Sequence, residues 1–216
     1  MRKCCVTNRQ TNEVRNEQVH SVVPVVTQLH NLLTQAEATY LIQTASQKFK
    51  KSTVVAKSGH GNVVNEQRSS TSAFLPKRAD KVIQCIEDRI ASVAGEPVDH
   101  LEPLQVTRYE EAQKYNPHHD YFPNVNTDGR QRTKTVFTYL NTVDEKCGGA
   151  TAFPNLKDKN EKVLRVYPVC GNATMWMNLN YDGTPEKNTL HAGEAVTCSN
   201  VVKHGLNAWF GNKKWQ

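Results

Sequence analysis

Two segments near the beginning of the chain carry apolar residues at the spacing of an amphipathic helix. The stretch TQAEATYLIQTASQKF begins with Thr34 and has Glu37 three residues later, which together form a capping box. A second periodic stretch predicts a helix over about 79–94, and Gly95 suits its end. The first part of the chain is therefore predicted to be helical.

From about Leu101 onward the apolar runs become short and rich in β-branched and aromatic residues, as in LQVTRYEE, KTVFTYLN, KVLRVYP and ATMWMNLN. Turn residues separate these runs, a pattern typical of a sandwich, jelly roll or barrel. Helices followed by strands predict an α+β fold, with a mainly β core and helices packed outside it. We divide the chain into an N-terminal extension, 1–25, and a single domain, 26–216, whose helical part is 26–98 and whose β part is 99–216.

Composition narrows the class of protein. A length of 216 residues and a hydrophobic fraction of 38% allow one large domain with its own core. Residues 56–70 contain glycines and few apolar anchors, so we expect a mobile loop that could close over a ligand. No apolar run approaches the ~18 residues of a membrane span, and no apolar region follows the basic start. We expect a cytoplasmic protein, unless the chain was trimmed from an endoplasmic-reticulum form.

Charge and cysteines add little. The net charge of +6 comes from Lys and Arg residues scattered among acids, which favours a solvated surface over a nucleic-acid partner. The six cysteines contain no CxxC pair and no zinc spacing. Free thiols and one or two disulfides both fit this pattern.

The polar cluster YNPHHDYF at 115–122 is the strongest candidate for chemistry. In an extended segment His118 and Asp120 face one side while His119 faces the other. Such a pair alone is more often a surface feature than a metal site. A third ligand, His191 on a distant strand, would complete the two-histidine, one-carboxylate triad of non-haem Fe(II) oxygenases.

Lys203 stands on the otherwise apolar strand VVKHGLNAWF. A lysine on an edge strand commonly guards against aggregation. The alternative is a buried cation that pairs with the carboxylate of a ligand.

Residues from about 26 to 210 resemble the catalytic domain of prolyl 4-hydroxylases, above all the small single-chain algal, viral and bacterial forms and the collagen enzyme. The likeness lies in segments that follow in the family's order, namely RSSTSAF, IEDRIA, EPLQVTRYEEAQKYNPHHDYF, QRTKTVFTYLN, GGATAFP and NLNYDGTPEKNTLHAG. It implies a double-stranded β-helix (jelly roll) with helices packed outside.

The resemblance also implies roles for individual residues. It implies that His118, Asp120 and His191 are the iron ligands. It implies that Lys203 pairs with the far carboxylate of 2-oxoglutarate. It places the cosubstrate's further partners at Tyr109 and Thr151, and at Trp209 unless that residue is a core tryptophan. It places the peptide substrate beside Tyr115, Arg132, Arg68, Ser70 and Glu102.

Two departures from the family's pattern matter. Lys203 follows His191 by twelve positions, two more than is usual, which indicates an insertion in the turn GEAVTCSNVV. Gly211 stands where some relatives carry a histidine near the substrate, so peptide preference is open.

The implied reaction is hydroxylation of peptidyl proline at C4 in proline-rich or collagen-like peptides. It would consume O2 and 2-oxoglutarate, need Fe(II) and ascorbate, and yield succinate and CO2. We expect a monomer. The alternatives are another 2-oxoglutarate oxygenase, for which Lys203 is a less typical carboxylate partner than arginine, a catalytically silent peptide-binding module, or a zinc hydrolase, for which HExxH is absent.

Overall fold

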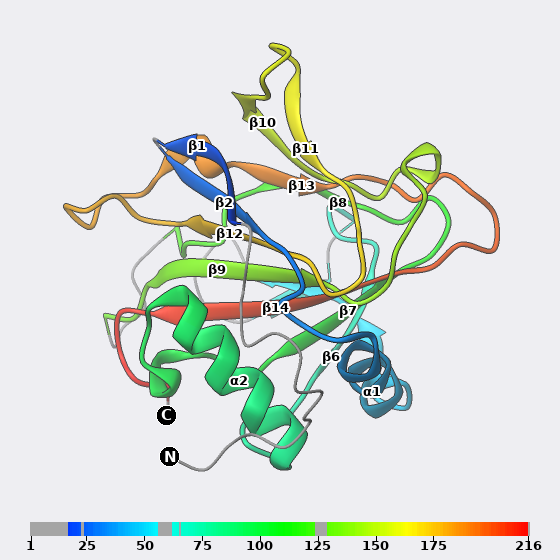
Figure 1. Ribbon diagram of the computed structural model, residues 1–216, viewed down its shortest axis with the longest axis horizontal. Helices are drawn as coiled ribbons and strands as arrows, with labels where there is room; N and C mark the ends of the chain where they lie inside the picture. Colours follow the sequence, from blue (N-terminus) through cyan, green and yellow to red (C-terminus); the bar gives the residue numbers. More distant parts are fainter. Residues whose placement is uncertain (1–16, 23, 56–61, 65, 124–128, 216) are drawn as a thin grey trace.

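The computed structural model describes residues 17–22, 24–55, 62–64, 66–123 and 129–215. Its centre is two facing β-sheets, with the helices against the outer face of the larger one (Figure 1). The larger sheet has the order β1-β2-β12-β9-β14-β7-β6-β3, and the smaller has the order β11-β10-β13-β8. A sheet closed onto a second sheet in this way is a jelly-roll core, as predicted.

The strands of the larger sheet are β1 (Glu17–Val22), β2 (Val25–Leu29), β12 (Ala173–Met177), β9 (Arg132–Tyr139), β14 (Lys203–Gly211), β7 (Gln105–Tyr109), β6 (Thr71–Phe74) and β3 (Lys50–Lys51). The smaller sheet contains β11 (Val163–Val166), β10 (Thr151–Lys157), β13 (His191–Gly193) and β8 (Tyr115–His118). A separate hairpin pairs β4 (Thr53–Val55) with β5 (Asn62–Val64). Short 3-10 turns are η1 (Val98–His100), η2 (Glu145–Cys147) and η3 (Lys187–Thr189).

Both predicted helices form, with the caps that the sequence indicates. Helix α1 (Gln35–Ala45) has Thr34 as its N-cap, and the capping box with Glu37 is complete. The helix ends before Phe49, sooner than its apolar pattern suggests. Helix α2 (Lys81–Ala94) is capped by Asp80 and ends at Gly95, whose φ of 66° is the left-handed conformation that glycine adopts without strain.

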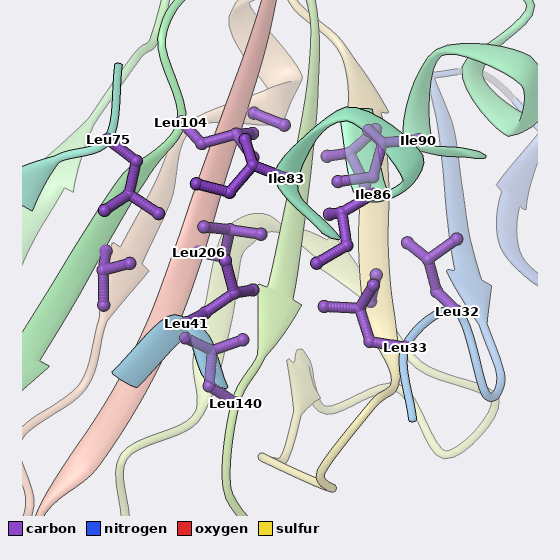
Figure 2. Close-up of a cluster of buried hydrophobic side chains, with 14 of the residues drawn as sticks. Leu32, Leu33, Leu41, Leu75, Ile83, Ile86, Ile90, Leu104, Leu140 and Leu206 are labelled. Atoms are coloured by element: carbon purple, nitrogen blue, oxygen red, sulfur yellow. The ribbon is translucent and has the colours of Figure 1, made fainter. Parts of the chain in front are cut away.

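The helices and the larger sheet enclose the first of two hydrophobic cores, shown in Figure 2. Ile83, Ile86 and Ile90 recur at the spacing of one helical face and are fully buried. They meet side chains such as Leu41 of α1 and Leu206 of β14. Each such side chain stabilises the fold by about 1.5–3 kcal/mol through removal from water.

The expectation that residues 26–98 are helical was wrong in part. This region also contributes β2, β3 and β6 to the larger sheet and forms the β4–β5 hairpin. On one side β2 pairs with the neighbouring β1 and β6 with β3, but their other partners are β12 and β7, farther along the chain, so local periodicity could not reveal the larger sheet. Within the expected loop at 56–70, β5 is a strand, while residues 56–61 and 65 lie outside the described residues.

The second core lies between the two sheets. Phe137, Tyr139 and Trp176 of the larger sheet meet side chains such as Phe153 and Leu164 of the smaller one. The Tyr139 hydroxyl is within 3.0 Å of Thr151 Oγ1 and within 3.0 Å of Thr174 Oγ1, so this buried polar group is satisfied. One end of the space between the sheets remains open and forms a pocket.

Cys4 and Cys5 lie outside the described residues; among those described, Cys147 and Cys198 form one disulfide. It joins the turn before β10 to the segment that contains the expected insertion. Backbone bonds reinforce the link, since Thr197 N donates to Cys147 O at 2.9 Å. In the part of the chain that the structure describes, no helix is long and apolar enough to cross a membrane.

Candidate active site

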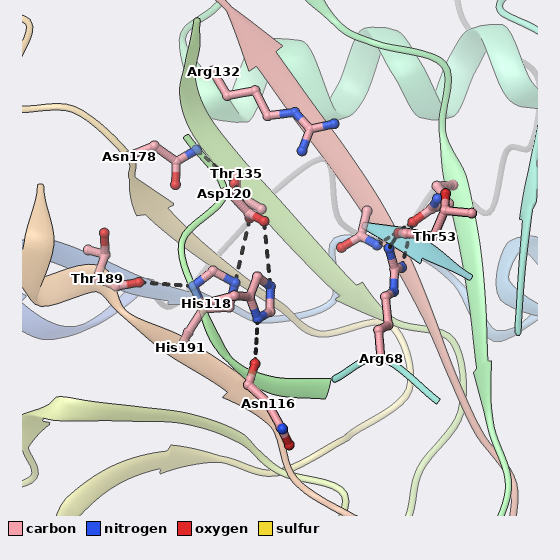
Figure 3. A network of polar contacts seen from close by, with 12 residues as sticks. Thr53, Arg68, Asn116, His118, Asp120, Arg132, Thr135, Asn178, Thr189 and His191 are labelled. Carbon is pink, nitrogen blue, oxygen red and sulfur yellow. Dashed lines mark hydrogen bonds and ion pairs between the residues drawn. The ribbon is translucent and has the colours of Figure 1, made fainter. Parts of the chain in front are cut away.

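Strand pairing brings the three candidate metal ligands together. His118 ends β8 and His191 begins β13, and the two residues are register partners. Asp120 lies two residues beyond the end of β8 and turns back toward both imidazoles (Figure 3). His118 Nε2 is 3.7 Å from Asp120 Oδ1, and His191 Nε2 is 3.6 Å from Asp120 Oδ2. The ligand atoms all lie within 4.8 Å of one another, a separation that a single metal ion can bridge.

The backbone fixes which nitrogen of each histidine faces the centre. His118 Nδ1 is 2.8 Å from the carbonyl of Asn116, and His191 Nδ1 is 2.9 Å from the carbonyl of Thr189. Each Nδ1 therefore carries the proton and donates it, which leaves Nε2 as the available ligand atom. His119 points away, as expected, and its Nε2 lies 3.0 Å from the carbonyl of Lys187.

Burial sets the charge of these groups. It holds the pKa of His118 well below its usual range and also lowers the pKa of His191. Burial opposes the charge on Asp120, but the neighbouring histidines, Arg132 and the Thr135 hydroxyl outweigh it and lower the pKa of Asp120 to about 2. Two neutral imidazoles and a carboxylate are the protonation states that bind a divalent metal. This donor set suits iron, so the three residues fit a bound Fe(II) ion.

The triad lines a pocket. Lys203, Tyr109, Thr151 and Trp209 line the same pocket, so the structure brings the candidate cosubstrate residues and the triad together.

Lys203 is a buried cation that forms no ion pair with an acid of the described residues. Its side chain is 1% exposed, and no carboxylate of the described residues lies within 4.0 Å of its Nζ. Aromatic rings surround the ammonium, with centroids 5.3 Å away for Tyr109 and 5.4 Å away for Phe137. Burial lowers the pKa of Lys203 to about 7. Burial excludes the first of the two roles that the sequence allowed, an exposed lysine that protects an edge strand from aggregation. The second role, a buried cation that pairs with a ligand carboxylate, stays a prediction.

The candidate substrate residues fall into two groups. Arg68 and Tyr115 line the pocket, and the Arg68 guanidinium lies over the Tyr115 ring at 4.9 Å. Arg132 and Glu102 form a bidentate pair with two 2.7 Å bonds, and Arg132 stacks on the Trp209 ring at 3.8 Å. Arg68 and Tyr115 therefore share the triad's pocket, whereas Arg132 and Glu102 are not among its lining residues.

Ser70 does not line the pocket. Its hydroxyl donates to Ser52 Oγ at 2.9 Å, and the residue is buried. Sequence reasoning missed the five other pocket residues, Phe137, Trp176, Ala192, Gly193 and Asn207. Trp176 lies 4.5 Å from His191 between ring centroids. The sequences around the missed residues look like ordinary β-strands. Only the alternation of side chains along each strand would have shown which residues face inward.

Comparison with known proteins decides the family. Residues 104–211 match the model of the 2OG-Fe(II) oxygenase superfamily. The chain is 39% identical over 186 residues to probable prolyl 4-hydroxylase 10 of Arabidopsis thaliana, covering 79% of this chain and 64% of the relative. It is 34% identical over 218 residues to prolyl 4-hydroxylase 5 of the same plant, covering 94% and 74%. The chain belongs to the prolyl 4-hydroxylase family.

Solved structures share the fold of this family member. The viral collagen prolyl hydroxylase of Paramecium bursaria Chlorella virus-1, in its 2OG complex, has a TM-score of 0.66 at 22% identity, covering 86% of this chain and 95% of that one. A Trichoplax adhaerens prolyl hydroxylase in complex with a peptide fragment of hypoxia inducible factor has a TM-score of 0.64 at 17% identity, covering 86% and 82%. The family uses Fe(II) and 2-oxoglutarate. The match to probable prolyl 4-hydroxylase 10 spans 64% of the length of that relative.

Proposed function

We propose that this chain hydroxylates peptidyl proline at C4, with Fe(II), 2-oxoglutarate and O2. The observation that supports this most strongly is the combination of the His118, Asp120 and His191 triad with the buried cation Lys203 in one pocket. A dicarboxylate cosubstrate needs both, a metal for one end and an opposite charge for the other.

The protein's own residues would do the following. His118 and His191 would offer Nε2, and Asp120 a carboxylate oxygen, to Fe(II). When bound, Fe(II) supplies the O2 chemistry that decarboxylates 2-oxoglutarate to succinate and CO2 and oxidises the C–H bond at proline C4. Lys203 would pair with the far carboxylate, and Tyr109 and Thr151 line the same pocket. The buried walls would keep water from the reacting atoms.

The pocket's surroundings suit a proline-rich or collagen-like peptide. Such peptides favour the polyproline II conformation, whose exposed carbonyls accept hydrogen bonds and whose rings pack on aromatic faces. Arg68 over Tyr115 and Arg132 over Trp209 offer both kinds of contact beside the triad. Ascorbate would support repeated turnover.

Mass spectrometry of a proline-rich peptide incubated with protein, Fe(II), 2-oxoglutarate and ascorbate tests the proposal. We expect a gain of one oxygen on proline that depends on 2-oxoglutarate. His118→Ala and Asp120→Ala should abolish it, because each removes a ligand. His119→Ala is the matched control, since this neighbouring side chain faces away, and it should keep activity.

Other outcomes decide between the alternatives. Succinate without oxidised proline would indicate an oxygenase with a different target residue. Neither product, across collagen-like and other proline-rich peptides, would contradict the proposal and favour a peptide-binding module.

A further inference from the structure

The three candidate metal ligands are held in different ways. Backbone carbonyls orient the two histidines, as described above, and no side-chain substitution can remove a carbonyl. Asp120 instead depends on side chains. Thr135 Oγ1 donates to Asp120 Oδ2 at 2.7 Å, and Asn178 Nδ2 donates to Thr135 Oγ1 at 2.9 Å (Figure 3).

The chemistry of these groups gives the chain of bonds one direction. An ionised carboxylate only accepts hydrogen bonds, so the single hydroxyl proton of Thr135 must point to Asp120. The lone pairs of the same hydroxyl then face Asn178, whose amide NH2 only donates. A hydroxyl that accepts one bond while donating another is polarised, and its bond to the carboxylate is strengthened.

The sheet fixes both residues that form this chain. Thr135 lies within β9 and is the register partner of Trp176 on β12. Asn178 directly follows β12, and its backbone N–H donates to the carbonyl of Thr133 at 2.8 Å. Thr135 is fully buried and Asn178 is 1% exposed, so water does not compete for these bonds. A rigid strand pair therefore supports a ligand that itself lies beyond the end of a strand.

We propose that Thr135 and Asn178 are positioning residues that set the orientation of the Asp120 carboxylate for the metal. This inference rests on the metal site of the proposed function. The Thr135 hydroxyl fixes the rotation of the carboxylate, and with it the spacing between the carboxylate oxygens and the two Nε2 atoms. Partners of this kind typically change metal affinity by about 10–100-fold.

A binding titration with Mn(II) alone tests the Asn178–Thr135–Asp120 relay without turnover. The electron paramagnetic resonance signal of the free ion measures how much Mn(II) is unbound. We expect Thr135→Val, which keeps shape but removes the hydroxyl, to weaken Mn(II) binding by about 10–100-fold. Thr135→Ser restores the hydroxyl and should return affinity to within about threefold of the original protein, because the same bond can form. Thr138→Val is the matched control, since this buried hydroxyl on the same strand has no hydrogen-bond partner among the described residues.

A double-mutant cycle tests the order of the chain. Asn178→Ala should weaken Mn(II) binding in the original protein but add little in the Thr135→Val background, because Asn178 acts only through Thr135. Unchanged affinity in Thr135→Val, an equal loss in Thr138→Val, or additive losses would each overturn the proposal. If Thr135→Val does not fold, Asn178→Ala alone decides, and unchanged Mn(II) affinity in that variant would overturn the proposal. A protein that binds Mn(II) as predicted but oxidises no peptide would contradict the proposed reaction and leave the relay intact.

Discussion

Raising the pH from 6 to 9 should weaken 2-oxoglutarate binding, because the Lys203 ammonium loses its proton in this range. Burial places the pKa of Lys203 at about 7 in the protein without cosubstrate. A carboxylate beside the ammonium would favour the charged form and raise this pKa. The bound state therefore holds a proton that the free state has lost above pH 7, and binding must take that proton up.

The size of the effect follows from that value. Below pH 7 Lys203 is already charged and affinity is nearly constant, whereas above pH 7 the dissociation constant rises about tenfold per pH unit. Binding should be about tenfold weaker at pH 8 than at pH 6, and about a hundredfold weaker at pH 9. Tyr115, another pocket residue, does not interfere, since burial raises its pKa to about 12.

Isothermal titration calorimetry of the Mn(II)-loaded protein measures both quantities. In buffers of different ionisation enthalpy, cosubstrate binding at pH 8 should take up about 0.9 proton, and at pH 6 about 0.1. Lys203→Arg provides the control, because a guanidinium stays charged throughout this range. Its affinity should be flat with pH, whatever its absolute value. A flat profile in the original protein, or no proton uptake at pH 8, would refute the assignment of Lys203 as the carboxylate partner.

Three further predictions concern the surroundings of the site and the fold. Glu102→Gln breaks the bidentate pair with Arg132 and should raise the peptide KM about tenfold with the cosubstrate KM unchanged, as steady-state kinetics would show. Cys147→Ser opens a disulfide that spans 51 residues and should lower the free energy of unfolding by about 4 kcal/mol in urea titrations, with no further loss on adding reductant. Ile86→Ala should cost about 2–5 kcal/mol in the same titration, while Val169→Ala at an exposed site should change little.

Local signals explain which parts of the fold could be predicted. The capping box of α1 and the glycine after α2 involve residues three or four positions apart, so they can be read directly from the sequence. The strands β2 and β6 join the larger sheet in part through partners distant in the chain, and their short runs do not indicate a sheet. The Cys147–Cys198 pairing likewise requires two loops to meet in space.

The same distinction applies to the site. His118 and Asp120 share a side of one segment, which spacing alone predicts, but His191 enters only through the register of β8 and β13. The sequence offered His191 as a partner on a distant strand, and the family resemblance then implied its role as a ligand. Thr135 and Asn178 gave no signal, because a threonine within a strand and an asparagine after one are ordinary features. Only coordinates show that the two side chains reach Asp120 in series.

The two hydrophobic cores have different relations to the pocket. Phe137 and Trp176 of the core between the sheets also line it, whereas the described members of the helix-side core contribute none of its lining. Substitutions that add stability around α2 would therefore leave the catalytic surface untouched. Such a reserve can offset destabilising changes elsewhere, which makes a new peptide preference easier to evolve. The helical layer thus acts as a source of evolvability for the chemistry on the opposite side of the sheet.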